Sequence, residues 1–336
     1  MVAQHGTILL PNGVPILSGA AVVGKKEAEG PLGDTFDYTL KEGHFGQKTW
    51  EKAERDLQAE ALRFALDKAS LSAQEISCIF SGDLLNQCIA SSFAHRASNT
   101  AYVGLYGACS TFAEGLALGA LAYHAGYVKT AAVCASSHFC SAERQYRYPN
   151  EYGGQRPPTA QWTVTGAGCV ILGEDAGAPQ IDAVTIGRIC DYGIYDVNHM
   201  GAAMAPAAYE SLHRAFADTH TAPEDYDLII TGDLGRIGSA LLEDLFRMED
   251  GISIAERHYD CGSAIYSEDD ADVKAGGSGA GCSAAVFSAH LLQKLQMGKF
   301  KRVLFAGTGA LLSPLTVQQG ESIPCICHTV SIKGGV

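Results

Sequence analysis

The sequence predicts an α/β protein made of two similar halves, each with a mixed β-sheet and helices packed on it. Three observations lead to this fold class: motifs that repeat in the same order, helices of small residues that end at glycine, and short apolar runs bounded by turn residues. The 336 residues suffice for about two domains. We expect residues 1–178 to form the N-terminal half and residues 179–336 the C-terminal half.

The first part of the repeat is a helix followed by a strand that ends in Gly-Asp-Leu. Apolar side chains recur at helical spacing in residues 50–68 and again in residues 207–217. The β-type run ISCIF then leads into SGDL at 81–84, and the run YDLII leads into TGDL at 231–234. The same order of elements therefore occurs twice along the chain.

The second part of the repeat is a helix that begins at a small-residue turn. The motif GACS at 107–110 opens a helix that ends at Gly126, and AGCS at 280–283 opens one that ends at Gly298. Glycine at such positions is typical of a helix C-cap. Each helix is followed by a β-type run, VKTAAVCAS in the first half and FKRVLFAGT in the second.

Two segments between the repeated motifs are predicted to be loops. Residues 138–163 are polar and aromatic with three prolines, which favours a long surface loop. The acidic run at 268–272 lies in a longer insertion, residues 239–279, and is predicted to be solvated. Arginines of the first loop are expected to be solvated or to make subunit contacts: Arg144, Arg147 and Arg156.

Composition excludes several classes of protein. The net charge of -13 argues against nucleic-acid binding, and 47% hydrophobic with 18% charged residues argues against a mostly disordered chain. No apolar run of about 18 residues is present, so we expect no transmembrane helix. The N-terminal run ILLPNGVPIL is broken by Pro11 and Pro15 and follows no basic region, so we expect no signal peptide.

The eleven cysteines are scattered and form no CxxC pair. Most lie inside apolar runs, which is typical of buried thiols in a reducing compartment. Cys325, Cys327 and His328 form a compact CxCH cluster, but no fourth ligand is evident. We therefore expect no metal site.

Cys109 is the residue with the clearest chemical signal. It lies between the β-type run TAYVGLY and a helix, where a sharp turn is required. A helix N-terminus favours an anion and lowers the pKa of a thiol, so Cys109 is a candidate nucleophile or ligand contact. The alternative is that it is one more buried cysteine.

These motifs resemble the thiolase superfamily. GACSTF matches the turn that carries the nucleophilic cysteine, and TGAG at 165–168 with CVILGED resembles the segment that precedes the second half. The resemblance implies two duplicated βαβαβ halves forming five layers, α/β/α/β/α. Asp233 falls in the region of the condensing enzymes' histidine, GGSGAGCSAA holds no asparagine, and the Cys-Gly-Gly and GHP motifs are missing.

One branch of the superfamily accounts for these departures. The phrases QRPPTAQWTVTGAG (155–168) and NHMGAAMAPAA (198–208) resemble the stage V sporulation protein AD family of endospore-forming bacteria. The resemblance implies non-catalytic binding of dipicolinic acid (pyridine-2,6-dicarboxylate) or its calcium chelate. It also implies a role in uptake of that ligand into the developing spore and its release in germination.

The same resemblance supplies the expected partners and location. The chain is expected to be peripheral to the spore inner membrane, bound to integral membrane subunits of the same transport assembly. No cofactor is expected beyond calcium held as part of the ligand. The alternative is an active ketoacyl-synthase- or thiolase-like acyltransferase that uses Cys109 with His138 or His199 as its base.

Six residues are expected to contact the ligand. Asp83 and Asp233 end equivalent strands and either cap the following turns or reach the ligand. Because dipicolinate is a dianion, carboxylates at the site would favour the calcium chelate. The six candidates are Cys109, Asp83, His199, His138, Asp233 and Met200.

We also expect a homodimer. In thiolase-like proteins an edge strand pairs with its two-fold mate, and we assign that role to residues 129–136. Pairing would cover the apolar edge AAVCA, which would otherwise promote aggregation.

Overall fold

The computed structural model describes residues 6–146 and 156–335. Within these residues, one large sheet has the strand order β10-β9-β12-β13-β8-β1-β7-β5-β3-β4, with β2 beside β1. A small sheet pairs β11 with β6. The order is a mirror repeat: β10-β9-β12-β13-β8 in the second half corresponds to β4-β3-β5-β7-β1 in the first.

Pairing directions repeat along with the strand order. In each half the three outermost strands run parallel to one another, and each of the next two strands is antiparallel to the strand before it. The predicted duplication is therefore confirmed. The strands of the first half are β1 (Thr7–Val23), β2 (Tyr38–Thr39), β3 (Cys78–Gly82), β4 (Ala101–Leu105), β5 (Ala131–Ser137), β6 (Trp162–Thr163) and β7 (Gly166–Leu172). The strands of the second half are β8 (Gln180–Thr185), β9 (Leu228–Thr231), β10 (His258–Asp260), β11 (Gly277–Ser278), β12 (Arg302–Ala310) and β13 (Cys325–Lys333).

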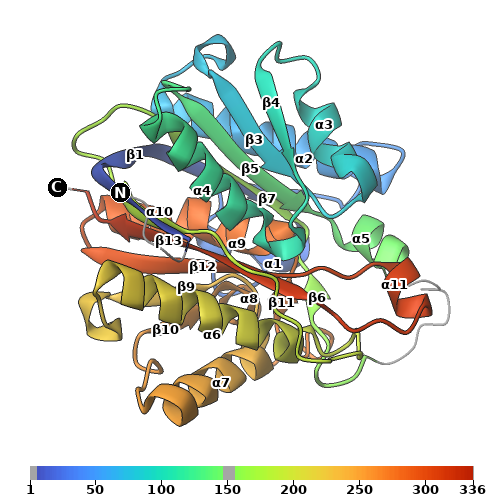
Figure 1. The fold of residues 1–336 in the computed structure, drawn as a ribbon. Coiled ribbons are helices and arrows are strands. Elements are labelled where there is room, and N and C mark those ends of the chain that lie inside the picture. The colour runs from blue at the N-terminus through green and yellow to red at the C-terminus, as the bar shows by residue number, and fades with distance from the viewer. Residues whose placement is uncertain (1–5, 147–155, 336) are drawn as a thin grey trace.

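The helices form three further layers around the two half-sheets (Figure 1). α4 lies between the halves and contacts strands of both, and α9 packs beside it. The helices of the first half are α1 (Lys25–Ala28), α2 (Trp50–Ala69), α3 (Ile89–His95), α4 (Thr111–His124) and α5 (Phe139–Tyr146). Those of the second half are α6 (Met200–Thr219), α7 (Gly235–Leu245), α8 (Cys261–Ala264), α9 (Ala280–Ala285), α10 (Leu292–Gln296) and α11 (Pro314–Gln318).

Single helical turns complete the chain between these elements. A turn of 3₁₀-helix, η4 (Ala108–Ser110), precedes α4, and a π-helical turn, η8 (Val286–Leu291), joins α9 to α10. The others are η1 (Gly33–Thr35), η2 (Ala73–Glu75), η3 (Asn86–Cys88), η6 (Pro223–Asp225) and the π-helical η7 (Phe246–Asp250).

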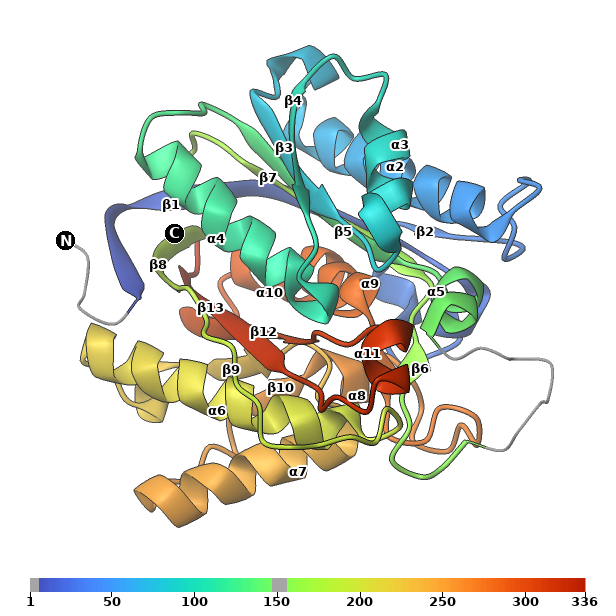
Figure 2. The same cartoon turned by 45° about the vertical axis from the view of Figure 1, so that its right-hand side comes forward.

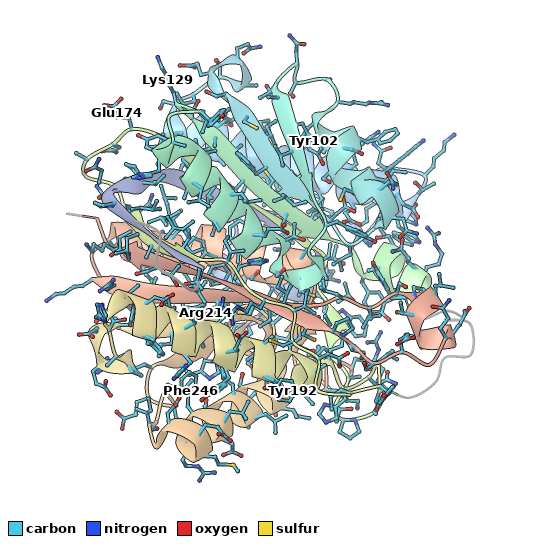
Figure 3. The ribbon with its side chains drawn as sticks, viewed as in Figure 1. Tyr102, Lys129, Glu174, Tyr192, Arg214 and Phe246 are labelled. Atoms are coloured by element: carbon cyan, nitrogen blue, oxygen red, sulfur yellow. The ribbon has the colours of Figure 1, made fainter. Side chains whose placement is uncertain are left out.

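The three largest hydrophobic cores of the described residues lie between the five layers. The central core packs α4 and the α9–η8 helix between the half-sheets, with Phe112, Phe287 and Phe305 in contact. The second core joins the first half-sheet to α2, and the third joins the second half-sheet to α6. Phe246, labelled in Figure 3, extends the third core toward the C-terminal end of α7.

Most predicted elements are confirmed, including both glycine C-caps. Gly126 has φ 75° and Gly298 has φ 68°, the left-handed conformation that favours glycine. The expected division after residue 178 falls in the connection between β7 and β8. The acidic run at 268–272 forms turns, where Asp270 pairs with Lys26 at 2.6 Å.

Two sequence interpretations were incomplete. The N-terminal proline-containing run was assigned no structure, yet it lies in β1, which pairs with β8 over its first part and with β7 over its second. The register shifts between Leu9 and Val14, so Pro11 sits where the ladder is already interrupted. The predicted loop at 138–163 contains the helix α5, while Arg147 lies outside the described residues.

The predicted dimer edge was also wrong. The segment 129–136 falls on β5, and β5 is paired on both sides, with β3 and with β7. A strand paired on both sides has no free edge to offer a second copy. The edge of the first half is β4.

No helix in the described part of the chain is both long enough and apolar enough to span a bilayer.

Candidate functional site

A pocket opens in front of the start of α4, where the two halves meet. The empty space between its walls, counted together with its open mouth, is about 590 Å³. Figure 2 shows α5, β6 and α11 gathered near that end of α4. The pocket is lined by Leu84, Ala108, Cys109, Ala142, Glu143, Tyr146, Thr163, Val197, Met200, Ser278, Gly279, Ala310 and Leu312.

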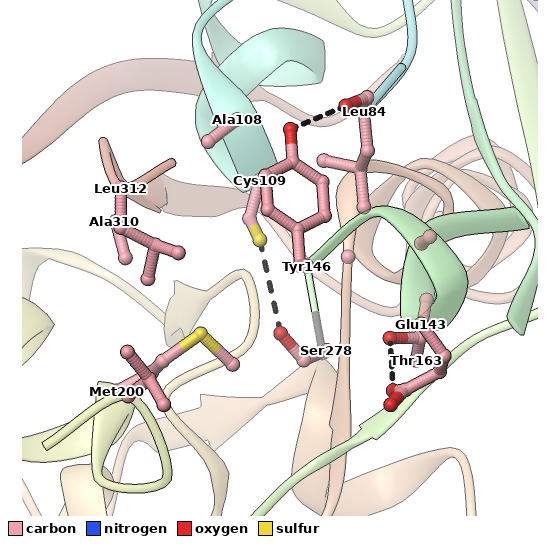
Figure 4. Close-up of a pocket in the computed structure, with 13 residues that line it drawn as sticks. Leu84, Ala108, Cys109, Glu143, Tyr146, Thr163, Met200, Ser278, Ala310 and Leu312 are labelled. Atoms are coloured by element: carbon pink, nitrogen blue, oxygen red, sulfur yellow. Dashed lines mark hydrogen bonds between the residues drawn. The ribbon is translucent and has the colours of Figure 1, made fainter. Parts of the chain in front are cut away.

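Cys109 lies at the base of the pocket, as the sequence suggested. The residue before it, Ala108, has φ 53°, so the chain turns sharply before α4. The Cys109 side chain points at Ser278, with Sγ 3.7 Å from the serine Oγ (Figure 4). The residue is only 7% exposed.

The expected lowering of the Cys109 pKa is not found. Burial raises the pKa of the thiol well above its usual value, and the negative charge of nearby Asp233 raises it further. The effect of the helix N-terminus is therefore outweighed by the loss of solvation. Cys109 is held as a neutral thiol at physiological pH.

Asp233 lies directly behind this thiol. Its Oδ2 accepts hydrogen bonds from the Ser278 hydroxyl at 2.9 Å and the Gly279 N–H at 3.0 Å, and its Oδ1 accepts one from Thr308 at 3.2 Å. Gly279 has φ 109°, a conformation that L side chains rarely adopt. Burial raises the pKa of Asp233 to about 6, although the hydrogen bonds with Cys109, Gly279 and Ser278 lower it.

Asp83 takes the capping role rather than lining the pocket. One carboxylate oxygen accepts from the Leu85 N–H, and the other accepts from both the N–H and the hydroxyl of Ser91. Burial raises its pKa. Because the neighbouring Leu84 does line the pocket, Asp83 fixes part of the pocket wall through the backbone.

The two histidines lie outside the pocket lining. His138 is 2% exposed; its Nε2 contacts the Gly43 carbonyl at 2.9 Å and its Nδ1 accepts from the Cys140 N–H. Burial lowers the pKa of His138. His199 is half-buried at the start of α6, next to Met200, and its side chain is absent from the residues that line the pocket.

Of the six predicted contacts, the structure thus brings Cys109 and Met200 into the pocket and places Asp233 one hydrogen bond behind it. Asp83 and His199 adjoin lining residues, whereas His138 packs against Trp50. Ligand contact by each of the six stays a prediction.

Sequence reasoning missed the wall that α5 contributes. Glu143 is 3% exposed, accepts from Thr163 at 3.0 Å and forms an ion pair with Arg156 at 2.9 Å. Arg156 is therefore not a solvated loop residue: its guanidinium also packs over Trp162 and donates to the Gln161 carbonyl. Only recognition of a helix at 139–146 could have indicated this wall.

The other α5 side chain in the wall is Tyr146. Its hydroxyl donates to the Leu84 carbonyl at 2.5 Å, and its ring stands beside Cys109 in Figure 4. α5 is anchored from behind, because the Ser141 hydroxyl donates to the buried Glu54 carboxylate at 2.8 Å. The pocket therefore presents an aromatic ring, apolar side chains and a paired carboxylate around a neutral thiol.

The described residues hold no cluster of three or more His, Cys, Asp or Glu side chains arranged to bind a metal ion. Cys325 and Cys327 are buried in β13, and His328 accepts a hydrogen bond from the Gly187 N–H at 3.1 Å. The CxCH cluster is thus part of the packing of β13.

The protein has a thiolase-like fold. A cerulenin-bound variant of OleA from Xanthomonas campestris superimposes with a TM-score of 0.63 at 15% identity, covering 97% of this chain and 98% of that one. The 3-oxoacyl-[acyl-carrier-protein] synthase III of Aquifex aeolicus VF5 superimposes with a TM-score of 0.57 at 14% identity, covering 96% and 100%. At these identities the likeness concerns the fold alone.

Sequence comparison gives the branch. The profile described as stage V sporulation protein AD matches residues 4–333. Stage V sporulation protein AD of Bacillus subtilis (strain 168) is 45% identical over 313 residues, which cover 93% of this chain and 92% of that protein. The chain belongs to the stage V sporulation protein AD family.

Proposed function

We propose that this protein binds dipicolinic acid or its calcium chelate in the Cys109 pocket, without catalysis, to support uptake into the developing spore and release in germination. The observation that carries the proposal is a pocket between the two halves whose lining is mostly apolar and whose base is a neutral thiol. Membership in the sporulation family supports the ligand and the setting. The family resemblance also supports a peripheral position at the spore inner membrane, beside integral membrane subunits.

The chemistry of the pocket suits a flat aromatic ligand with polar edges. Tyr146, Met200 and Leu312 offer an aromatic and apolar surface, and the start of α4 favours a carboxylate. The walls carry the carboxylate of Glu143, with Asp233 behind Cys109. The charge of Glu143 is offset by Arg156, so the carboxylate of Asp233 is the group that favours the calcium chelate over the free dianion, because calcium offsets the repulsion.

A pair of substitutions at Cys109 tests the site. Cys109→Ser keeps the size of the side chain and the shape of the pocket, so affinity for calcium dipicolinate changes less than about threefold. Cys109→Trp fills the base of the pocket, so calorimetry detects no saturable binding. Thermal unfolding of both variants shows whether the fold is retained; a folded Cys109→Trp protein that binds normally contradicts the site.

The second candidate function is acyl transfer by Cys109. The left-handed Ala108 before the thiol favours it, since strained turns often present reacting side chains. The raised pKa of Cys109 opposes it, and no histidine is among the described residues that line the pocket. Incubation with acetyl-CoA distinguishes the two: intact-mass analysis finds an acetylated Cys109 only if acyl transfer occurs.

We further propose that the protein is a homodimer formed through β4 rather than β5. β4 is the edge of the first half-sheet, and apolar side chains are exposed beside it. These are Ile89 and Phe93 of α3, Val103 of β4 and Tyr106 after it, each between 39% and 51% exposed. Pairing β4 with its two-fold mate would satisfy the strand edge and cover these side chains.

A further inference from the structure

Two thiols face each other on the central strands of the first half-sheet, away from the ligand pocket. Cys134 on β5 and Cys169 on β7 are direct partners in the antiparallel register. Their Sγ atoms are 2.9 Å apart, and both side chains are buried at 1% exposure or less. They lie in the core under α2, with Leu57 and Ala61.

A histidine stands beside this pair. His95, the last residue of α3, is 5% exposed, and its Nε2 has no hydrogen-bond partner of normal length among the described residues. Its ring packs against Tyr102 of β4, which is labelled in Figure 3. The Cys134 thiol lies next to this imidazole.

The surroundings separate Cys134 from the other buried cysteines. Burial alone would raise its pKa, but the hydrogen bond between Cys134 and Cys169 and the contact with His95 lower it below the usual value. The pKa values of Cys169, Cys261 and Cys282 are instead raised well above the usual value. A thiolate is the reactive form toward peroxides, so Cys134 is the one with the required chemistry.

We propose that Cys134 and Cys169 are a peroxide-sensitive dithiol that closes to a cross-strand disulfide. His95 takes the Cys134 proton, and the thiolate sulfur attacks one oxygen of hydrogen peroxide. The O–O bond breaks, leaving Cys134 sulfenic acid and hydroxide, and the hydroxide takes a proton to become water. The Cys169 sulfur then attacks the sulfenic sulfur, the S–O bond breaks, and a second water leaves with the Cys169 proton.

In this balance two thiols lose two electrons and two protons to one peroxide, which becomes two waters. Because the residues already oppose each other across the ladder, the S–S bond forms without a change of register. Access comes from the α3 side, since this seven-residue helix follows Gln87 and Cys88, both in the left-handed conformation. Local opening of such a short, strained segment exposes His95 and Cys134 to a small oxidant.

Peptide mapping of the full-length protein tests the proposal without any variant. The protein is treated with hydrogen peroxide and then denatured in the presence of N-ethylmaleimide, which alkylates the remaining free thiols. It is then digested without reductant. We expect a Cys134–Cys169 cross-linked peptide pair to form before any other cysteine is oxidised. Its mass is two hydrogens less than the summed masses of the two peptides with free thiols. Full alkylation of Cys134 and Cys169 while other cysteines oxidise overturns the proposal.

Two variants examine the roles of the residues. In the Cys169→Ser variant, no second thiol is present to react with the Cys134 sulfenic acid. The sulfenic acid therefore accumulates and is trapped by dimedone. Absence of the dimedone adduct in a folded variant overturns the assignment of Cys134 as the attacking thiol. His95→Gln keeps a polar side chain of similar reach, and the cross-link forms several-fold more slowly. An unchanged rate overturns the part assigned to His95.

Discussion

Replacing Asp233 by asparagine tests the electrostatics at the base of the pocket. Asp233 has a pKa of about 6 in the folded protein against 3.8 without the protein environment. A carboxyl with a raised pKa binds its proton more tightly in the folded state, so its contribution to stability is fully present below pH 3.8 and is lost as the pH rises through 6. The full difference of about 2.2 units corresponds to about 3 kcal/mol.

The measurable part of this effect lies between pH 4.5 and 7. Linkage across that window gives a loss of about 2 kcal/mol from the free energy of unfolding of the unmodified protein. Asp233→Asn cannot ionise, so the variant lacks this loss. The stability difference between the two proteins should therefore change by about 2 kcal/mol in favour of the variant from pH 4.5 to 7.

Urea unfolding at several pH values measures this change directly. The part of the stability difference that does not change with pH reports the hydrogen bonds from Ser278, Gly279 and Thr308. The part that changes with pH reports the ionisation of Asp233. Asp244→Asn, at a surface ion pair with Arg247, is a matched control that should change the slope little. A pH-independent difference for Asp233→Asn would refute the raised pKa.

The remaining predictions concern the pocket wall and the dimer. Asp83→Asn removes an acceptor for Leu85 or Ser91, so chemical denaturation should show a loss of about 1–3 kcal/mol. Because Asp83 acts through the backbone of Leu84, calorimetry should find weaker dipicolinate binding by this variant both with and without calcium. If the variant instead binds dipicolinate more weakly with calcium and more tightly without it, Asp83 contacts the ligand directly. Val103→Lys should convert the dimer to a monomer in sedimentation at micromolar concentration, whereas Tyr127→Lys, at an 87% exposed site, should not.

The duplicated architecture could be predicted because its signals are local and occur twice. Glycines that must adopt a left-handed conformation mark the ends of α4 and α9–α10, and the Gly-Asp-Leu motifs mark the ends of β3 and β9. β1 could not be predicted in the same way. Pro11 falls where the register with β8 is interrupted, and that interruption depends on a strand more than 160 residues away.

Two residues that line the pocket, Cys109 and Met200, could be singled out from the sequence. The sequence-based prediction of the remaining lining was incomplete. The position of Cys109 follows from the local turn, but the pKa of its thiol depends on Asp233, which is brought near by the second half. The α5 wall was missed because Glu143 and Tyr146 lie in a polar segment with several prolines. Their role depends on contacts with Arg156 and Leu84, which no local pattern indicates.

The same limit explains the error in the dimer edge. The apolar run AAVCA in β5 indicates burial, but burial inside a sheet and burial against a second copy give the same sequence pattern. β4 carries exposed positions along most of its length, and the pairing of strands identifies it as the edge.

Titration of the unmodified protein with dipicolinate, in the presence of calcium and in the presence of a calcium chelator, measures the proposed binding itself. We predict saturable binding of one ligand per chain, at least about tenfold tighter with calcium than without, because the carboxylate of Asp233 opposes a free dianion. Absence of saturable binding under both conditions would contradict the proposed function.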